Sequence, residues 1–182
     1  TVQALLLKEG DNVIEIGCGT GKNLELLSAA AGPGGTVFGF DVSKGMLSRA
    51  IGRKEKNNLT NVELILTDAS DYTPSKKINA VLFSLSYATM IHRREVLKKM
   101  WNLISPGGRV VIMDAQYPPG LAGKLMAPVK PFITLFLRAS VLGNPHIKIT
   151  AELSEITGMN PGVTEYSMKT YFIATAVKPF SR

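Results

Sequence analysis

The sequence predicts an α/β fold, in which a mostly parallel β-sheet carries helices on both faces and ends in an antiparallel hairpin. Short apolar runs rich in Val, Ile and Phe alternate with helical patterns along the chain, as in consecutive βαβ units. The last two apolar runs are separated by only a couple of residues around Lys169 and Thr170, which permits a hairpin and excludes a helical crossover. At 182 residues, the chain is expected to form one domain over residues 1–182.

Seven apolar runs have the length of buried strands. Five precede the proline-rich part of the chain and are expected to pair in parallel, and the last two form the hairpin. The predicted strands are 12–16, 36–40, 62–66, 80–84, 109–113, 163–168 and 171–177.

Amphipathic helices are predicted over 22–31, 44–56 and 93–104. The turn 105–108, Ser-Pro-Gly-Gly, ends the third helix because proline cannot continue it. Between residues 117 and 150, five prolines interrupt an apolar helical pattern, so broken helices are expected there. The expected buried positions of the three helices are Leu24, Leu27 and Ala31; Leu47, Ala50 and Ile51; and Val96, Leu97, Met100, Trp101 and Ile104.

Composition excludes several kinds of site. Cys18 is the only cysteine, so an internal disulfide and a cysteine metal cluster are excluded, and a reducing, cytoplasmic setting fits. His92 and His146 show no metal-ligand spacing, and Asp68 and Asp71 lack a third ligand, so no metal is expected. No run reaches the roughly 18 apolar residues that span a bilayer, and a soluble protein is expected.

The formal net charge of +7 favours anionic partners, nucleic acid among them. The basic residues form short clusters without interleaved aromatic residues, which is typical of solvated helix faces and argues against nucleic-acid binding.

The strongest motif is the run Val13-Ile-Glu-Ile-Gly-Cys-Gly-Thr-Gly21, an apolar strand that leads through a glycine-rich turn into a helix. Glycines permit unusual backbone torsions and close approach of a ligand, and a helix N-terminus favours an anionic group. The spacing is GxGxG, whereas dinucleotide sites use GxGxxG, and Lys22 stands where the last dinucleotide glycine belongs. This argues against a nicotinamide-dependent oxidoreductase.

Asp41 ends the second predicted strand, where a carboxylate can accept hydrogen bonds from both hydroxyls of a ribose. Its alternative role is to cap the following helix, although Ser43 can serve as that cap.

These motifs, with Asp68-Ala69 after the third strand and Leu103-Ile-Ser-Pro-Gly-Gly-Arg-Val-Val-Ile112 entering the fifth, resemble class I S-adenosylmethionine-dependent methyltransferases. The resemblance implies a Rossmann-like, doubly wound seven-stranded sheet, with S-adenosylmethionine as cofactor and S-adenosylhomocysteine as product. It implies that the glycine loop wraps the methionine part of the cofactor and that Glu15 fixes this loop. It also implies that Asp41 holds the ribose and that Asp68 binds the adenine amino group. Val42 and Met46 are then expected to line the adenine pocket. The expected cofactor-binding residues are Glu15, Gly17, Cys18, Gly19, Gly21, Asp41, Val42, Met46, Asp68, Ala69, Ser84 and Leu85.

The residues that follow the fourth strand are expected to contact the methyl acceptor. Tyr87 is expected either to orient the acceptor through its hydroxyl or to have a structural role. His92 is either a proton acceptor or a solvated residue at the start of a helix. Methyl transfer from a sulfonium is a direct displacement, so no catalytic triad is required.

Within the class, the run 86–91 and the Pro-Gly-Gly strand look most like ubiquinone/menaquinone-type C-methyltransferases and phospholipid or betaine-lipid N-methyltransferases. A small or amphiphilic acceptor is therefore expected: an amine, a lipid head group or a quinone precursor. The segment 121–142 is expected either to form an apolar wall for such an acceptor or to rest on an anionic membrane surface. The alternative is an ordinary core-covering helix broken by proline.

The sequence lacks the N-terminal region that closes over the substrate in those subfamilies, and it starts at Thr1, so an upstream lid segment is expected. Two alternatives stay open: a non-catalytic S-adenosylmethionine-binding protein, and a methyltransferase acting on RNA or protein. The second is disfavoured because Ser-Leu-Ser-Tyr stands at 84–87 in place of an Asn/Asp-Pro-Pro-Tyr motif.

Overall fold

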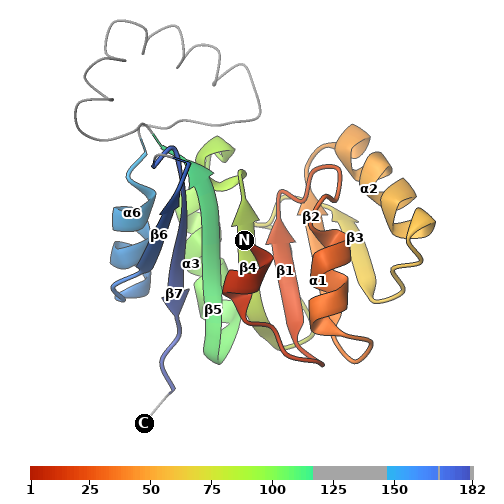
Figure 1. Cartoon of the computed structure of the whole chain (residues 1–182), viewed down its shortest axis with the longest axis horizontal. Helices are drawn as coiled ribbons and strands as arrows, with labels where there is room; N and C mark the ends of the chain where they lie inside the picture. The colour runs from red at the N-terminus through yellow and green to blue at the C-terminus, as the bar shows by residue number, and fades with distance from the viewer. Residues whose placement is uncertain (117–146, 168, 181–182) are drawn as a thin grey trace, which may run out of the picture.

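The computed structural model describes residues 1–116, 147–167 and 169–180, and its centre is a seven-stranded sheet in the order β3-β2-β1-β4-β5-β7-β6 (Figure 1). The strands are β1 (Asn12–Ile16), β2 (Thr36–Asp41), β3 (Val62–Leu66), β4 (Ile78–Ser84), β5 (Ile104–Ala115), β6 (Gly162–Tyr166) and β7 (Tyr171–Val177).

The first five strands are parallel, and the last two form antiparallel pairs. β1 lies between β2 and β4 and pairs in parallel with both, whereas β7 runs antiparallel to β5 and forms the hairpin with β6. The strand order reverses between β1 and β4, and ligands of open α/β sheets bind at such a switch point, outside the carboxyl ends of the strands. The predicted fold class is confirmed.

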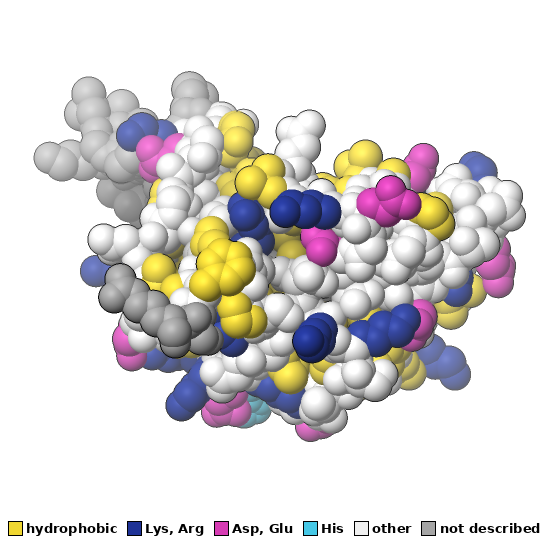
Figure 2. Space-filling model, turned by 90° about the horizontal axis from the view of Figure 1, so that it is seen from below, with side chains coloured by type: hydrophobic (Ala, Val, Ile, Leu, Met, Phe, Trp, Pro, Cys, Tyr) yellow, Lys and Arg dark blue, Asp and Glu magenta, His cyan; other side chains and the backbone are white. Residues whose placement is uncertain are grey.

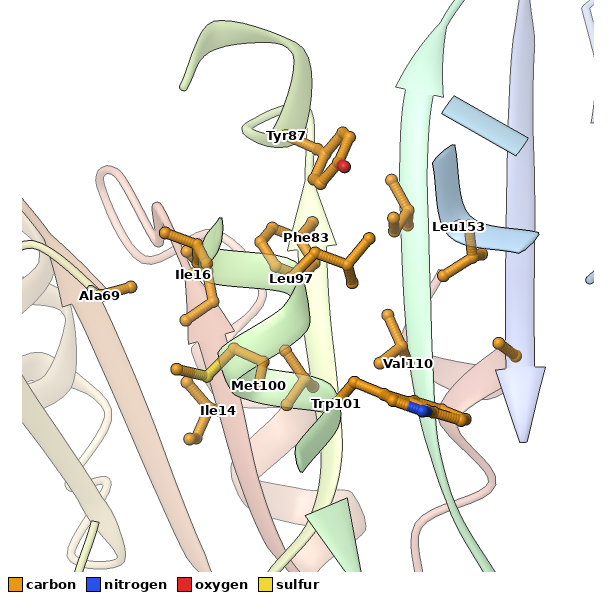
Figure 3. Close-up of a cluster of buried hydrophobic side chains, with 14 of the residues drawn as sticks. Ile14, Ile16, Ala69, Phe83, Tyr87, Leu97, Met100, Trp101, Val110 and Leu153 are labelled. Atoms are coloured by element: carbon orange, nitrogen blue, oxygen red, sulfur yellow. The ribbon is translucent and has the colours of Figure 1, made fainter. Parts of the chain in front are cut away.

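Alternate residues of the central strands enter two hydrophobic cores, one on each face of the sheet. Ile14, Ile16 and Phe83 belong to one core, and their neighbours Val13 and Leu82 belong to the other. The first core is covered by α3 (Arg93–Leu103) and α6 (Ile149–Thr157), and Figure 3 shows its buried side chains. The second core is covered by α1 (Leu24–Ala31) and the 3-10 helix η1 (Val2–Leu5), which lie in front of the sheet in Figure 1.

The helix predictions are confirmed apart from their ends and one buried position. Trp101 of α3 is buried, as its place on the apolar side of the helix predicts. In α2 (Lys44–Lys56), Leu47 and Ala50 are buried but Ile51 is 42% exposed, because α2 packs on the sheet with only a narrow stripe of residues. α1 begins two residues later than predicted, since Lys22 and Asn23 belong to the preceding turn.

Two further differences concern long-range pairing. β5 begins at Ile104 and includes the predicted turn 105–108, because Gly107 donates to the Lys178 carbonyl and Lys178 donates to the Gly108 carbonyl, both at 2.8 Å. α6 was not predicted as a separate helix; it packs against α3, a contact that its own sequence does not show. The broken helices expected at 117–150 lie largely outside the described residues.

Candidate functional site

A cavity of about 1070 Å³ opens at the carboxyl ends of the parallel strands, among the residues that follow β1, β2, β3 and β4. Of the predicted site residues, those that line it are Glu15, Gly17, Cys18, Gly19, Asp41, Val42, Met46, Asp68, Ala69, Ser84, Leu85 and His92. Gly21 and Tyr87 do not line it. The sequence therefore located the cavity, and the structure separates lining residues from supporting ones.

The three glycines of the turn after β1 all have a positive φ, which L side chains rarely adopt: +69° at Gly17, +56° at Gly19 and +75° at Gly21. A Cβ on Gly17 would lie 2.6 Å from Ser86 Cβ, and one on Gly21 would lie 2.5 Å from Leu24 Cδ1. A Cβ on Gly19 would meet nothing within 4 Å. Gly17 and Gly21 are thus required by packing inside the protein, whereas Gly19 borders open cavity space.

Asp41 ties this turn to the end of β2. Its Oδ2 accepts the Gly19 N–H and its Oδ1 accepts the Ser43 N–H, both at 2.8 Å. The N-cap of α2 is Ser43, whose Oγ accepts the Met46 N–H at 3.3 Å. Asp41 is therefore not the helix cap, and each of its oxygens keeps a lone pair for a further donor.

Glu15 lies beneath the glycine turn and is 1% exposed. Its Oε1 accepts from Asn23 Nδ2 at 2.6 Å, while Oε2 is the one buried side-chain polar atom without a partner among the described residues. Burial raises the pKa of Glu15 to about 7, and the Asp41 charge adds to this rise although the Asn23 hydrogen bond opposes it. Sequence reasoning missed Asn23, whose only signal was its place at the start of a helix.

Cys18 and Asp68 have opposite electrostatic surroundings. Burial, with the charges of Glu15 and Asp41, raises the pKa of the Cys18 thiol to about 12, so this cysteine is not a nucleophile. The Ser70 backbone N–H and hydroxyl, each 2.9 Å from Asp68 Oδ1, hold the pKa of Asp68 below its usual value. Asp68 is an ionised acceptor at the cavity edge.

The two residues predicted to face the acceptor lie in different places. His92 lines the cavity, and its side chain is 62% exposed, 3.7 Å from Glu95. Tyr87 is 0% exposed and lies in the core beside Phe83, as Figure 3 shows. The orienting role considered for the Tyr87 hydroxyl does not agree with this position, because that hydroxyl donates to Glu152 at 2.9 Å, away from the cavity.

Ser86, Thr89, Met90 and Ile91, in the run after β4 where contacts to the methyl acceptor are predicted, also line the cavity. The lining further includes residues that sequence reasoning did not assign to the site, among them Lys22, Asn23 and Arg49 near the glycine turn, and Val96 and Met113 on the other side. No group of three or more His, Cys, Asp or Glu residues suited to a metal occurs in the described part of the chain. Helices long and apolar enough to cross a membrane are likewise absent from those residues.

Figure 2 shows the opposite end of the sheet, where Lys and Arg side chains lie in separate groups interspersed with acidic ones. The described residues of that face show no continuous basic stripe of the kind that tracks a phosphate backbone.

A family model described as "Methyltransferase domain" matches residues 7–135. The chain belongs to this methyltransferase family. It is 29% identical over 119 residues to demethylmenaquinone methyltransferase of Geobacillus sp. (strain WCH70), covering 65% of this chain and 51% of that protein. This methyltransferase chain thus spans about half the length of the curated relatives it matches.

Solved structures with the same fold include a SAM-dependent methyltransferase from Aquifex aeolicus, with a TM-score of 0.74, 20% identity, and coverage of 97% of this chain and 86% of that one. An rRNA methylase from Streptococcus thermophilus has a TM-score of 0.67, 18% identity, and coverage of 98% and 93%. At these identities the likeness concerns the fold alone.

The methyltransferase domain thus has the class I, Rossmann-like fold that the motifs imply. The cavity suits the expected cofactor, S-adenosylmethionine, on two local grounds. Gly19 borders open space, and the unpartnered Glu15 Oε2 is a buried acceptor that a ligand donor can satisfy.

Proposed function

We propose that this methyltransferase binds S-adenosylmethionine in the cavity and methylates a small amphiphilic acceptor, with a quinone precursor of the demethylmenaquinone kind as the best candidate. The observation that carries the proposal is the incomplete polar lining at the glycine turn, where Glu15 Oε2 has no partner and Gly19 leaves ligand space. Buried polar groups are almost always satisfied, so an unsatisfied one in a cavity wall points to a ligand.

The proposed cofactor contacts come from three strand ends. Asp41 accepts from the ribose hydroxyls with its free lone pairs while holding the Gly19 N–H in place. Asp68, kept ionised by Ser70, accepts from the adenine amino group, with the Ala69 backbone beside it. Val42 is 70% exposed and lines the cavity with Met46, so these two side chains offer apolar surface to the adenine ring.

When bound, the cofactor supplies a methyl group on a positively charged sulfur, ready for direct displacement. The residues of the chain align the acceptor, exclude water and hold the glycine turn rigid. Alignment alone can contribute about 7–11 kcal/mol toward lowering the barrier. No residue of this chain has to form a covalent intermediate.

The acceptor side of the cavity carries apolar side chains, which supports an acceptor with a hydrophobic ring or tail. Met90, Ile91 and Met113 are among its lining residues, and Ile91 is 89% exposed. The name of the Geobacillus relative supports a quinone precursor over an amine or a lipid head group.

The first experiment is calorimetric titration of the purified chain with S-adenosylhomocysteine and, separately, NADH. Asp41→Ala removes the proposed ribose acceptor and is expected to weaken S-adenosylhomocysteine binding about 100-fold, since each hydrogen bond to a charged group contributes about 1.5–3 kcal/mol. Glu25→Ala is the control, because Glu25 is an exposed carboxylate in the first turn of α1 and does not line the cavity.

Transfer of radiolabelled methyl groups to a short-chain demethylmenaquinol, an alkylamine and phosphatidylethanolamine vesicles then identifies the acceptor. Methylation of the quinol alone supports the full proposal. Tight S-adenosylhomocysteine binding without transfer to any of the three would replace it with a non-catalytic or differently directed domain. A correctly folded wild type that binds no S-adenosylhomocysteine would overturn it.

A further inference from the structure

The segment 84–92 forms one side of the cavity, and we refer to it as the acceptor wall. All its residues line the cavity except Tyr87 and Ala88, which are buried on the other side. Met90 and Ile91 give this wall an apolar surface, against which the proposed acceptor would lie. The wall includes the short 3-10 helix η2 (Tyr87–Thr89) and no residue of the longer helices, so its shape depends on what holds it from behind.

Consecutive residues of the acceptor wall are fixed to different parts of the fold. The Leu85 N–H donates to the Met113 carbonyl at 2.8 Å, with Leu85 at a φ of +56°. The Ser86 hydroxyl donates to the Ile16 carbonyl at 2.5 Å. These contacts attach the beginning of the wall to β5 and β1.

A buried acid, Asp114, and a partly buried one, Glu152, hold its centre. The Ala88 N–H donates to Asp114 Oδ2 at 3.1 Å, and Asp114 is 1% exposed. The Tyr87 hydroxyl donates to Glu152 Oε2 of α6 at 2.9 Å. The second contact is the only side-chain hydrogen bond from the wall to α6 within the described residues.

Glu152 is in turn held by Arg93, at the start of α3. Arg93 Nε lies 3.1 Å from Glu152 Oε2 and Nη2 lies 2.9 Å from Oε1, a two-pronged pairing that fixes the carboxylate plane. The Arg93 and Glu152 side chains are 24% and 15% exposed. Burial alone would raise the pKa of Glu152, but the bonds from Arg93 and Tyr87 outweigh it and keep that pKa below its usual value. Glu152 therefore stays an ionised acceptor for the phenol.

The neighbouring pair Arg94–Glu155 joins the same two helices but lies in solvent. Its atoms are 2.6 Å apart, and the side chains are 43% and 67% exposed. Exposed ion pairs contribute little, so this pair is a matched control for the partly buried Arg93–Glu152 pair.

We propose that Tyr87, Glu152 and Arg93 act as a unit that positions the acceptor wall, and so set the affinity and alignment of the methyl acceptor without touching it. Tyr87 is in this view a positioning residue that acts through Met90 and Ile91. The expected change in KM rests on the proposed function, whereas the expected change in hydrogen exchange over 84–92 can be measured without any turnover.

The test compares Tyr87→Phe, which removes only the hydroxyl, and Glu152→Gln with the control Glu155→Gln. Hydrogen exchange of the peptide covering 84–92 is measured in the full chain, where the Thr89 and Met90 amides donate to the Ser86 and Tyr87 carbonyls. Loss of a hydrogen bond to a charged group is expected to speed exchange there about tenfold in the first two variants and not in the control. S-adenosylhomocysteine affinity is expected to stay within about twofold of wild type, because the glycine turn and Asp41 are not altered.

With demethylmenaquinol as acceptor, Tyr87→Phe is expected to raise KM more than it lowers kcat. Unchanged hydrogen exchange over 84–92 would overturn the inference. A loss of S-adenosylhomocysteine affinity as large as the increase in exchange would also overturn it, because the three residues would then have a general structural role. Wild type that turns over no quinol would refute the proposed acceptor, while the exchange data would still decide the role of the three residues. If Tyr87→Phe does not fold, Arg93→Lys, which keeps the charge but loses the two-pronged geometry, is expected to show the same exchange increase.

Discussion

The two sides of the cavity are built differently. On the cofactor side, the glycine turn, Asp41 and Asp68 lie at or just beyond the ends of their own strands, and both acids accept from a backbone N–H two residues further on; the longer link, from Asp41 to Gly19, joins the ends of neighbouring strands. On the acceptor side, the wall at 84–92 is held by Ile16, Asp114 and Glu152, which are far away in the sequence.

The two sides also differ in how complete their polar contacts are. The cofactor side keeps a buried carboxylate oxygen, Glu15 Oε2, with no partner, whereas the buried side-chain polar atoms of the acceptor wall all have partners in the described residues. The difference suggests that the cofactor side is completed by its ligand, while the acceptor wall is rigid before any ligand binds. Four substitutions test this contrast, in addition to the experiments above.

The largest expected effect separates two glycines of the same turn. Gly17→Ala puts a Cβ 2.6 Å from Ser86 Cβ at a positive φ, and is expected to lower the free energy of unfolding by about 3 kcal/mol, from backbone strain plus overpacking. Gly19→Ala has the strain but no overlap, so about 1–2 kcal/mol is expected.

Urea unfolding and S-adenosylhomocysteine titration check this pair. Gly19→Ala is expected to lose affinity more than stability, because its methyl group occupies ligand space. Equal stability losses in both variants would show that the glycine turn does not press on the acceptor wall at Ser86.

A smaller and pH-dependent effect is expected at Glu15. Its folded pKa of about 7 lies above the ordinary value of 4.5, so the folded state keeps a proton that the unfolded state has lost. Stability therefore falls as pH rises from about 4.5 to 7, by at most about 3 kcal/mol. Glu15→Gln is expected to remove this loss and to melt at a higher temperature than wild type at pH 8, with a smaller difference at pH 5.

The same variant is expected to bind S-adenosylhomocysteine more weakly at pH 8, since it lacks the charged acceptor. Asp114, whose pKa burial raises to about 6, contributes a loss of the same sign in both proteins and cancels in the comparison. A loss of stability between pH 5 and pH 8 that is equally large in wild type and Glu15→Gln would assign the whole effect to another group.

The smallest effect is expected at His92, which is largely exposed beside Glu95. His92→Gln is expected to change neither the melting temperature nor S-adenosylhomocysteine affinity measurably, as for most surface substitutions. Methyl transfer to demethylmenaquinol decides between its two interpretations. A rate loss of about 100-fold or more would make His92 a proton acceptor, and an unchanged rate would leave it a solvated residue.

Much of the fold was predictable because its signals are local. The strands from β1 to β4 and the helices α1 to α3 follow from the period of apolar residues, and the hairpin follows from its short connection. α6 and the long start of β5 were not predicted, since α3 and Lys178 respectively determine them through contacts distant in sequence.

The sequence by itself determined the fold class, the family and the position of the cavity, because the glycines and acids that mark the cavity stand at strand ends, and strands and turns have local signals. Only the tertiary structure decided that Tyr87 faces the core, that Asn23 supports Glu15, and that Arg93 pairs with Glu152. The physical reason is that the partner of a side chain depends on which segments of the chain pack against each other in the fold. No short-range pattern in the sequence carries that information.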